Sequence, residues 1–399
     1  MNTAHNAVTS SLENRIIAKI KASGPIGIDD YMTACLSDAA SGYYQHHDPF
    51  GVAGDFITAP EISGLFGEMC GFYLAHMFDL AKANSVAGMA GGELVELGPG
   101  RGTLMRDMHH VWQKLMPQMA EMPVNFVETS PALRTVQSAT LKPVTPIWHD
   151  AVDTLPQTPI FGIANEFFDA LPITQLVWRA NSKNEVGQSG GWHHRLVGLV
   201  NDWPEMRQST GTGADLSIER LGFVDGPRLD DVALAMHHAV LPEAPCDGSI
   251  AECCLAGDKI LAQLAVRIAH HGGAMLIIDY GRDGNGQDSL QAVANHQPVD
   301  VFHAPGAADL SHWVDFAALQ RSAAANGCRL IGPVEQGSFL MNVGLKTRAE
   351  QAGNNADPDM RRALLAAIDR LTNPAQMGAV FKVTLLVPQG RGIPPGFEG

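Results

Sequence analysis

The sequence predicts an α/β protein with a doubly wound, mostly parallel sheet of the Rossmann-like type. Two observations support this prediction. From about residue 92, short apolar runs alternate with helical segments, which is typical of parallel strands joined by crossover helices. The stretch VELGPGRGTL, residues 95–104, also places three glycines directly after the first of these runs. A strand, a glycine-rich turn and a helix in this order are typical of folds that bind nucleotide-like ligands.

Residues 1–85 are predicted to form a helical cap and a lid ahead of this core. Ser10 and Glu13 match a capping box, so we expect the first helix to begin there. A second helical pattern follows Pro60, and its broad apolar face includes Phe72.

The core is expected in two parts, residues 86–175 and 251–390. Its apolar runs predict strands that alternate with amphipathic helices, and two further runs near the C-terminus are expected to close the sheet. The expected strands are 93–98, 124–129, 144–150, 160–168, 273–281, 337–345 and 379–387, and the expected helices are 103–115, 131–141 and 259–271.

Two insertions are expected at the carboxyl ends of the strands, where ligands bind in such folds. Residues 176–250 contain short exposed strand patterns and predict a β-rich subdomain. Residues 282–325 predict a second insertion that includes a helix beginning near Asp309.

Composition excludes several functional classes. A formal net charge of −15 argues against nucleic acid and against docking on anionic lipid, because both need basic surface. The six cysteines form no C-x-x-C pair, and no histidines have the spacing of metal ligands, so we expect reduced thiols and no metal site. The N-terminal residues do not read as a signal peptide, and no stretch reads as membrane-spanning, so we expect a cytoplasmic protein without membrane insertion.

The glycine spacing points to a particular cofactor. Gly98, Gly100 and Gly102 follow a G-x-G-x-G pattern, whereas the nicotinamide fingerprint is G-x-G-x-x-G. Glu96 would be unfavourable beside a pyrophosphate, but a carboxylate suits a ligand that carries an ammonium group. S-adenosylmethionine has a cationic amino-acid end and no phosphate, so it is the cofactor that we predict. An oxidoreductase is disfavoured by the same spacing.

Two further acids are predicted to bind this cofactor. Glu128 ends the second core strand and would accept hydrogen bonds from both ribose hydroxyls, as acids in this position do in dinucleotide folds. Asp150 follows the third strand and would accept from the adenine amino group. The alternatives are that Glu128 caps the next helix and that Asp150 is only a turn residue.

Several separated motifs resemble the MidA-like family of class I S-adenosylmethionine-dependent methyltransferases, which is linked to assembly of respiratory complex I. The motifs are GDFITAPEISGLFGE, VELGPGRGTLMRD, VETSPALRTVQ, NEFFDALPI and PGAADLSHWVDFAAL, and the resemblance runs from about residue 24 to 345. It implies methylation of a protein arginine, which in the mitochondrial members belongs to a quinone-side subunit of complex I. Ala307 and residues 311–313 depart from the family pattern at the rim of the acceptor site.

The acceptor chemistry is predicted from ANEFFDALP, residues 164–172. The loop after the fourth strand faces the transferable methyl group in this fold, so Asn165, Glu166 and Asp169 are the candidate catalytic residues. A guanidinium stays protonated in water, and carboxylates are needed to orient it and to take its proton. Glu166 is the first candidate for a bidentate clamp and Asp169 the second. The alternative is a plain strand end and turn, with Phe167 and Phe168 in the core.

The lid is expected in GDFITAP, residues 54–60. Gly51 and Gly54 would supply its bends, and Thr58 would lie near the methionine end of the cofactor. Asp55 and Thr58 could equally cap the helix that follows, which is compatible with a lid.

Other functional classes stay open at this point. An assembly chaperone could hold S-adenosylmethionine as a structural ligand, and methylation of a small-molecule oxygen or nitrogen is not excluded. A protein client is the expected partner, and the oligomeric state, a homodimer included, is not determined by the sequence.

Overall fold

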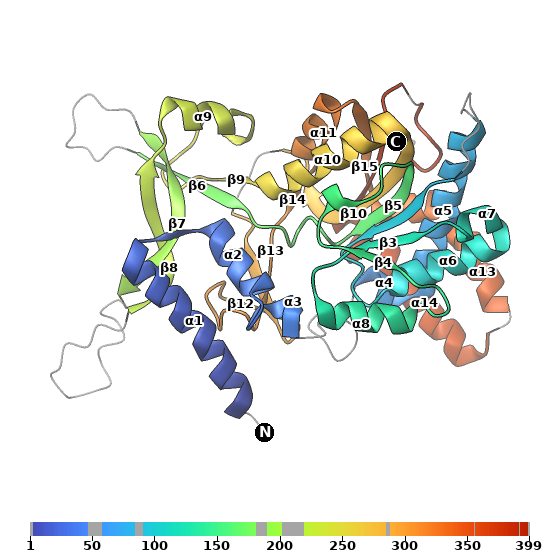
Figure 1. The fold of residues 1–399 in the computed structure, drawn as a ribbon, viewed down its shortest axis with the longest axis horizontal. Coiled ribbons are helices and arrows are strands. Elements are labelled where there is room, and N and C mark those ends of the chain that lie inside the picture. The colour runs from blue at the N-terminus through green and yellow to red at the C-terminus, as the bar shows by residue number, and fades with distance from the viewer. Residues whose placement is uncertain are drawn as a thin grey trace. The chain divides into compact units, whose positions relative to one another are not determined.

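The structure is a computed structural model that describes residues 3–46, 58–83, 91–180, 190–201, 219–284, 288–354, 356–390 and 392–397. The chain divides into two compact units (Figure 1). Unit 1 consists of Met1–His47, Leu171–Ala256 and Gly284–His312, and unit 2 of Asp48–Ala170, Gly257–Asp283 and Trp313–Gly399.

Unit 2 contains the predicted doubly wound sheet. Its strands lie in the order β15-β16-β10-β5-β2-β3-β4, and β14 pairs with β10. The strands β4, β3, β2, β5 and β10 are parallel, while β16 runs antiparallel to both β10 and β15. The carboxyl ends of the five parallel strands therefore share one edge of the sheet. The bounds are β2 (Glu93–Leu97), β3 (Val124–Val127), β4 (Ile147–His149), β5 (Ile160–Asn165), β10 (Gly273–Arg282), β14 (Val314–Asp315), β15 (Cys328–Glu335) and β16 (Phe381–Pro388).

Helices separate the parallel strands along the chain, as the alternating pattern predicts. They are α4 (Ala59–Ile62), α5 (Gly64–Ala83), α6 (Thr103–Leu115), α7 (Pro117–Ala120), α8 (Pro131–Thr140), the 3-10 helix η1 (Val152–Thr154), α10 (Leu255–His271), α11 (Phe316–Ala325), α12 (Gln336–Asn342), α13 (Leu345–Asn354), α14 (Pro358–Thr372) and α15 (Met377–Val380).

The core of unit 2 forms where α5 packs on α6 and on the sheet. Phe78 of α5 meets Phe161 of β5 edge to face, with ring centroids 5.2 Å apart. The two helices approach closely at Gly71, where an added Cβ would lie 2.8 Å from the Cα of Met108. The Gly71 carbonyl oxygen also accepts a 2.7 Å hydrogen bond from the Trp112 indole. This packing fixes α6 and, with it, the glycine turn at its N-terminus.

Unit 1 is built around a second, antiparallel sheet in the order β1-β7-β6-β9, with β8 paired to β7. Strands β6, β7 and β8 are the ones expected in the stretch after residue 175. The N-terminal helices join the same unit because β1 pairs with β7, with Ile26 opposite Val197. The elements are α1 (Thr3–Ser23), β1 (Ile26–Gly27), α2 (Ile28–Ser37), α3 (Tyr43–His46), β6 (Thr174–Arg179), β7 (Gly191–Asn201), β8 (Glu219–Arg228), α9 (Asp231–His237), the 3-10 helix η3 (His238–Val240), β9 (Ile250–Cys253), β11 (Gln291–Ala294), β12 (Gln297–Val299) and β13 (Asp309–Ser311).

Of the two strands expected near the C-terminus, 379–387 is present as β16 and 337–345 is wrong. Residues 337–345 do not form a strand, since Gln336–Asn342 is helix α12, with Phe339 and Leu340 buried and Met341 exposed. A short apolar run fits a strand or a buried helix equally well by periodicity alone. The sheet instead closes with β15, Cys328–Glu335.

Two helix starts and one buried position also differ from expectation. Asp309 begins strand β13, and α11 begins at Phe316, where the Asp315 carboxylate accepts the Ala318 N–H at 3.1 Å. Helix α1 begins at Thr3, so Ser10 lies within it rather than at its start. Phe72 is exposed because the buried face of α5 is formed by its neighbours Tyr73 and Met69.

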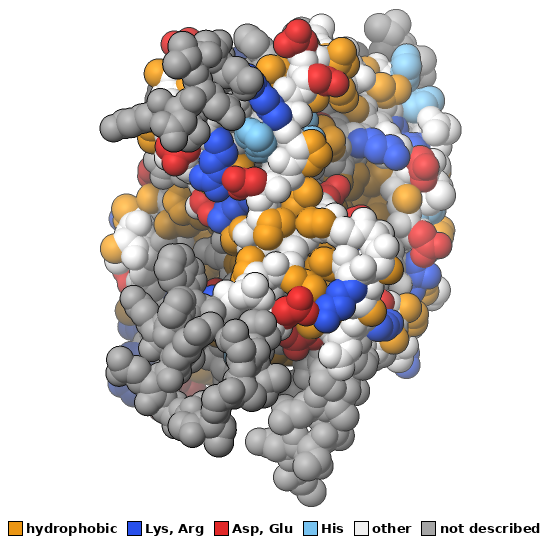
Figure 2. Space-filling view, turned by 90° about the vertical axis from the view of Figure 1, so that its left-hand side faces the viewer, with side chains coloured by type: hydrophobic (Ala, Val, Ile, Leu, Met, Phe, Trp, Pro, Cys, Tyr) orange, Lys and Arg blue, Asp and Glu red, His pale blue; other side chains and the backbone are white. Residues whose placement is uncertain are grey.

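The described residues show how the charges, apolar helices and cysteines of the chain are arranged. On the face drawn in Figure 2, acidic and basic side chains are interspersed with hydrophobic ones, so the described part of this face has no patch of a single sign. Within the described ranges no helix is long and apolar enough to cross a membrane. The same ranges contain no group of metal-ligating side chains. The six cysteines are all free thiols.

Candidate functional site

The glycine turn between β2 and α6 has a backbone that only glycine adopts easily. Gly98, Gly100 and Gly102 all have positive φ, at 59°, 52° and 79°. A Cβ on Gly98 would lie 2.9 Å from a ring carbon of Phe167, and a Cβ on Gly102 would lie 2.9 Å from Leu141. Glycine is therefore required at these two positions both by the backbone conformation and by the close approach of Phe167 and Leu141.

Glu96 lies in β2, two residues before the turn, and is almost fully buried. The main-chain N–H of Met105 interacts with its carboxylate, but its Oε2 has no hydrogen-bond partner. Burial raises the pKa of Glu96 well above its usual range. A buried carboxylate oxygen without a donor is costly, so this position is suited to a ligand that brings N–H groups.

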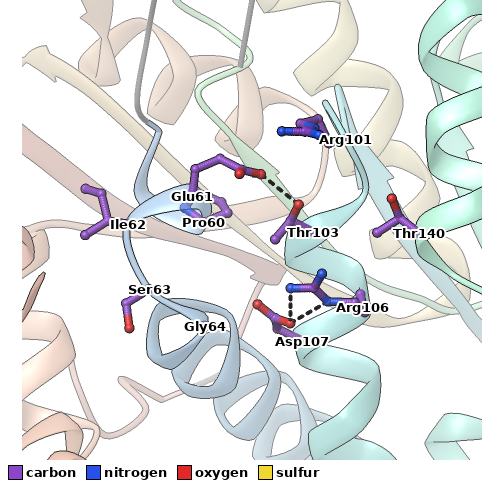
Figure 3. Close-up of a pocket in the computed structure, with 10 residues that line it drawn as sticks. All are labelled: Pro60, Glu61, Ile62, Ser63, Gly64, Arg101, Thr103, Arg106, Asp107 and Thr140. Carbon is purple, nitrogen blue, oxygen red and sulfur yellow. Dashed lines mark hydrogen bonds and ion pairs between the residues drawn. The ribbon is translucent and has the colours of Figure 1, made fainter. Parts of the chain in front are cut away.

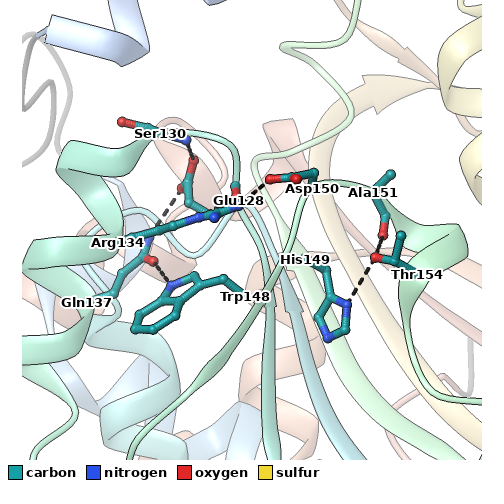
Figure 4. Close-up of polar contacts among 9 residues, drawn as sticks. All are labelled: Glu128, Ser130, Arg134, Gln137, Trp148, His149, Asp150, Ala151 and Thr154. Carbon is teal, nitrogen blue, oxygen red and sulfur yellow. Dashed lines mark hydrogen bonds and ion pairs between the residues drawn. The ribbon is translucent and has the colours of Figure 1, made fainter.

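Glu128 follows β3, and its carboxylate is oriented from two sides (Figure 4). Its Oε1 accepts the Ser130 N–H at 2.7 Å, and its Oε2 accepts from the Gln137 amide at 3.2 Å. Burial raises the pKa of Glu128, and these two hydrogen bonds oppose the rise. Ser130, rather than Glu128, caps α8, because its hydroxyl accepts the Leu133 N–H. The capping alternative for Glu128 is therefore not what the structure shows.

Asp150 follows β4 and is joined to the Glu128 position through a basic side chain. Arg134 donates to the main-chain oxygen of Glu128 and makes a 2.5 Å ion pair with the Asp150 carboxylate. The Asp150 side chain is 82% exposed. It therefore lies at the sheet edge, where a ligand can still reach it.

The sequence did not single out Gln137, which joins these parts together. Its side chain is fully buried because it lies on the same core-facing side of the helix as Leu133. Its amide nitrogen donates to the Gly100 carbonyl at 2.8 Å as well as to Glu128, and its oxygen accepts from the Trp148 indole at 2.8 Å. A polar residue at a helix position that faces the core is the signal that could have found it.

The acceptor loop begins where β5 ends. Asn165 is buried, and its amide donates to Glu166 Oε1 at 3.1 Å, while Asn165 Oδ1 has no partner. Glu166 has a φ of 50°, a strained conformation for a residue other than glycine. Its N–H is held by the Ile278 carbonyl of β10 at 2.9 Å.

The two loop carboxylates have raised pKa values. Burial and then the negative charge of Asp169 raise the pKa of Glu166 to about 7, and hydrogen bonds from the Ala59 N–H and from Asn165 oppose this. Burial raises the pKa of Asp169 to about 6, opposed by a hydrogen bond from Tyr280. Asp169 Oδ1 is buried without a partner. The structure thus brings Asn165, Glu166 and Asp169 together, and Phe167 lies over the glycine turn rather than in the core.

Of the residues expected in the lid, Gly51, Gly54 and Asp55 lie outside the described residues. Thr58 is the residue that precedes α4, and its main-chain oxygen accepts the Glu61 N–H at 2.9 Å, without a side-chain cap. The next residue, Ala59, donates its N–H to Glu166 Oε1 at 3.2 Å. The end of the predicted lid is therefore tied directly to the acceptor loop.

A polar pocket of about 380 Å³ lies between α4 and the first turns of α6 (Figure 3). Thr103 donates to Glu61 at 2.7 Å across it, and Arg106 pairs with the neighbouring Asp107 at 2.8 Å. The second carboxylate oxygen of Asp107 is buried without a partner and lies 3.2 Å from where a Gly64 Cβ would be. That oxygen faces the N-terminus of α5, whose dipole suits a negative charge. The pocket borders the glycine turn through Arg101 and Thr103.

The chain is similar to known methyltransferases. A family model of S-adenosyl-L-methionine-dependent methyltransferases matches residues 69–334. The rat protein arginine methyltransferase NDUFAF7, mitochondrial, is 35% identical, covering 97% of this chain and 86% of the relative. Its Drosophila melanogaster homologue is 32% identical, with 95% and 85% covered. A crystal structure of a Burkholderia thailandensis protein bound to S-adenosyl-homocysteine superposes with a TM-score of 0.77 at 23% identity, covering 100% and 95% of the two chains.

The comparisons also correct one prediction. The relatives from rat, human and fly are named as mitochondrial proteins. The prediction of a cytoplasmic location, which depended on the N-terminal residues not reading as a targeting signal, is therefore wrong.

Proposed function

The chain belongs to the family of S-adenosyl-L-methionine-dependent methyltransferases, and on that premise we propose that it methylates an arginine side chain of a protein client. The observation that carries the proposal is a set of unsatisfied buried acceptors at the carboxyl end of β5. Asn165 Oδ1 and Asp169 Oδ1 have no donor, and the Glu166 carboxylate lies beside them. A guanidinium offers five N–H donors and no acceptor, so its chemistry matches this set.

The cofactor-binding residues are proposed on similar grounds. The unpartnered Oε2 of Glu96 suits an ammonium group, and we propose that the positive-φ turn of Gly98, Gly100 and Gly102 lets the cofactor approach the main chain. We propose that Glu128 binds the ribose, that Asp150 lies near the adenine, and that Thr58 lies near the methionine end. When bound, S-adenosylmethionine supplies a methyl group on a sulfonium sulfur.

The loop residues then account for the fate of the proton. As the guanidinium nitrogen forms its bond to the methyl carbon and the carbon–sulfur bond breaks, that nitrogen must lose one proton. Glu166, with a pKa of about 7, is poised to accept it, because a base is most effective when its pKa is near the working pH. We propose that Glu166 clamps the guanidinium and takes the proton, and that Asp169 is the second carboxylate of the clamp.

The proposed client is a protein with an exposed basic segment, and a quinone-side subunit of complex I is the specific candidate. The relatives are named protein arginine methyltransferases, which supports a protein acceptor. The net charge of −15 also favours a basic client. Binding of the client should therefore weaken as salt rises, and salt-independent binding would count against this choice.

The proposal is tested by mass spectrometry of the complex I quinone-side subunit after incubation with the enzyme and S-adenosylmethionine. We expect a methylated arginine with the wild type and a loss of transfer on the order of 100-fold with Glu166→Gln. Glu68→Gln, a carboxylate on α5 that pairs with Arg348, is the control and should leave transfer unchanged. Cofactor binding without transfer to this client would instead favour an assembly chaperone, and transfer to a small molecule alone would favour a small-molecule methyltransferase.

A further inference from the structure

Asp279 lies in β10 at the same level as the acceptor loop, and its side chain is fully buried. In the pairing of β10 with β5, Ile278 lies opposite Asn165, so Asp279 comes next to the residues that follow Asn165. The residues of β10 that precede it, 273–278, carry no charge. A charged residue at the end of a buried strand is costly unless it is fully hydrogen-bonded.

Asp279 meets this requirement with main-chain groups of the acceptor loop. Its Oδ2 accepts three consecutive N–H groups, from Phe167 at 3.2 Å, Phe168 at 2.9 Å and Asp169 at 3.3 Å. Its Oδ1 accepts the Tyr280 N–H at 2.9 Å. In the described part of the chain, the three loop N–H groups have no main-chain acceptor. Asp279 therefore supplies the hydrogen bonds that a helix or strand would otherwise provide.

The same contacts separate the role of Asp279 from that of the other two acids. A carboxylate has about four acceptor sites, and all four contacts of Asp279 are main-chain donors. Its Oδ2 is fully occupied, and its complete burial leaves no surface for a substrate. Asp169, in contrast, has a buried oxygen without a partner, and Glu166 is only partly buried. Asp279 thus acts through the loop and not on the acceptor.

The loop that Asp279 holds also touches the glycine turn. The Phe167 ring lies against Gly98, where it leaves no room for a Cβ. The left-handed residue Glu166 directly precedes Phe167, and its own N–H is held by Ile278. The β10 strand therefore fixes residues 166–169 through four N–H groups in a row, and the loop conformation sets where the two proposed catalytic carboxylates point.

We propose that Asp279 is the positioning residue of the acceptor site: by binding the N–H groups of residues 167–169 it holds Glu166 and Asp169 in register with the cofactor turn. This inference rests on the proposed function for its catalytic consequence, but its structural part does not. A displacement of about 1 Å at a reacting group can lower the rate on the order of 100-fold.

The first test needs no variant. Hydrogen–deuterium exchange of the wild-type protein should show the amides of residues 167–169 protected about as strongly as those of β5, although they lie outside any helix or strand. Rapid exchange of these amides, as in an ordinary exposed loop, would overturn the proposal whether or not any acceptor is methylated.

The second test is Asp279→Asn, which keeps the shape but offers one acceptor oxygen instead of two. We expect loss of amide protection confined to the 166–169 loop, with S-adenosylmethionine affinity close to wild type and kcat for the quinone-side subunit lower by about 100-fold. Thr384→Val is the matched control: Thr384 is fully buried on the adjacent strand β16 and donates to the Ile277 carbonyl. This control should leave both loop protection and kcat unchanged.

The outcomes are distinguishable. If Asp279→Asn and Thr384→Val lower kcat equally for equal losses of thermal stability, Asp279 is only a structural residue and the proposal fails. If the wild type protects the loop but transfers no methyl group to any arginine, the proposed function fails while the positioning of the loop by Asp279 stands.

Discussion

Gln137 donates a 2.8 Å hydrogen bond to the carbonyl oxygen of Gly100, so a residue of α8 holds the central glycine of the turn. The same amide nitrogen reaches Glu128, and the amide oxygen accepts from Trp148. One buried side chain therefore sets the distance between the two predicted binding positions for the cofactor.

Replacing Gln137 by methionine, which is similar in shape but lacks the amide, should weaken S-adenosylmethionine binding by about 10-fold or more. The substitution leaves the Gly100 carbonyl and the Trp148 N–H without partners, and each unsatisfied buried group costs about 1–3 kcal/mol. Isothermal titration calorimetry measures the change. Gln336→Met is the matched control, because Gln336 of α12 is equally buried and donates to the Leu371 carbonyl of α14. Equal losses of affinity in both variants would contradict the role of Gln137 at the turn.

Cofactor binding should release a proton from Glu96. Burial holds the pKa of Glu96 well above its usual range, and an ammonium group beside the carboxylate would lower that pKa again. Calorimetry in two buffers of different ionisation enthalpy should therefore give different apparent enthalpies. Glu96→Gln should remove the difference and weaken binding by about 10- to 100-fold, as expected for a lost charged hydrogen bond. A wild-type enthalpy that does not depend on the buffer would count against this position for the ammonium group.

The rate of methyl transfer should rise with pH through about 7 and then level off. A proton acceptor must be ionised to act, and Glu166 has a pKa of about 7. Burial sets this value first, followed by the charge of Asp169, the hydrogen bonds from Ala59 and Asn165, and the charge of Arg370. A kcat profile between pH 5 and 9 checks the prediction. The residual activity of Glu166→Gln should lack this rise; if it keeps the same rise, another group is the base.

Stability should depend on pH in the opposite sense to activity. A carboxyl whose pKa is raised on folding contributes stability that is present below its ordinary pKa and is lost as pH rises through the folded value, here about 7. Glu166→Gln should therefore gain about 1–2 kcal/mol relative to the wild type between pH 5 and pH 8. Urea unfolding at the two pH values measures this gain. A constant difference between the two proteins would show that Glu166 does not change its ionisation on folding.

The parts of the fold that the sequence predicts are those with local signals. The glycine turn, the helix that follows it and the buried strand β10 each depend on residues a few positions apart, and all three are present. The sequence also places Asn165, Glu166 and Asp169 at the end of β5 and just after it, because an acid directly after a buried strand is a local feature; their catalytic role stays a prediction.

The parts that were missed depend on partners far along the chain. Asp279 and the loop it binds are about 110 residues apart, and no pattern within either segment shows the connection. Gln137 and Gly100 are 37 residues apart. Gln137 also lies among other polar residues of its helix, so the sequence does not show that this side chain is buried. The run 337–345 was misassigned for a related reason: only the placement of β15 beside β16 decides that it need not be a strand.

The position of β16 in the sheet has a consequence for synthesis on the ribosome. This strand, Phe381–Pro388, is the last element of the sheet to emerge, yet it lies between β10 and β15 and pairs with both. In a nascent chain β10 can pair with β5 early. β15 cannot pair with its neighbour in the finished sheet, β16, until residue 388 has left the exit tunnel. Until then the growing chain exposes an unpaired apolar edge on β10, which is the kind of surface that chaperones bind.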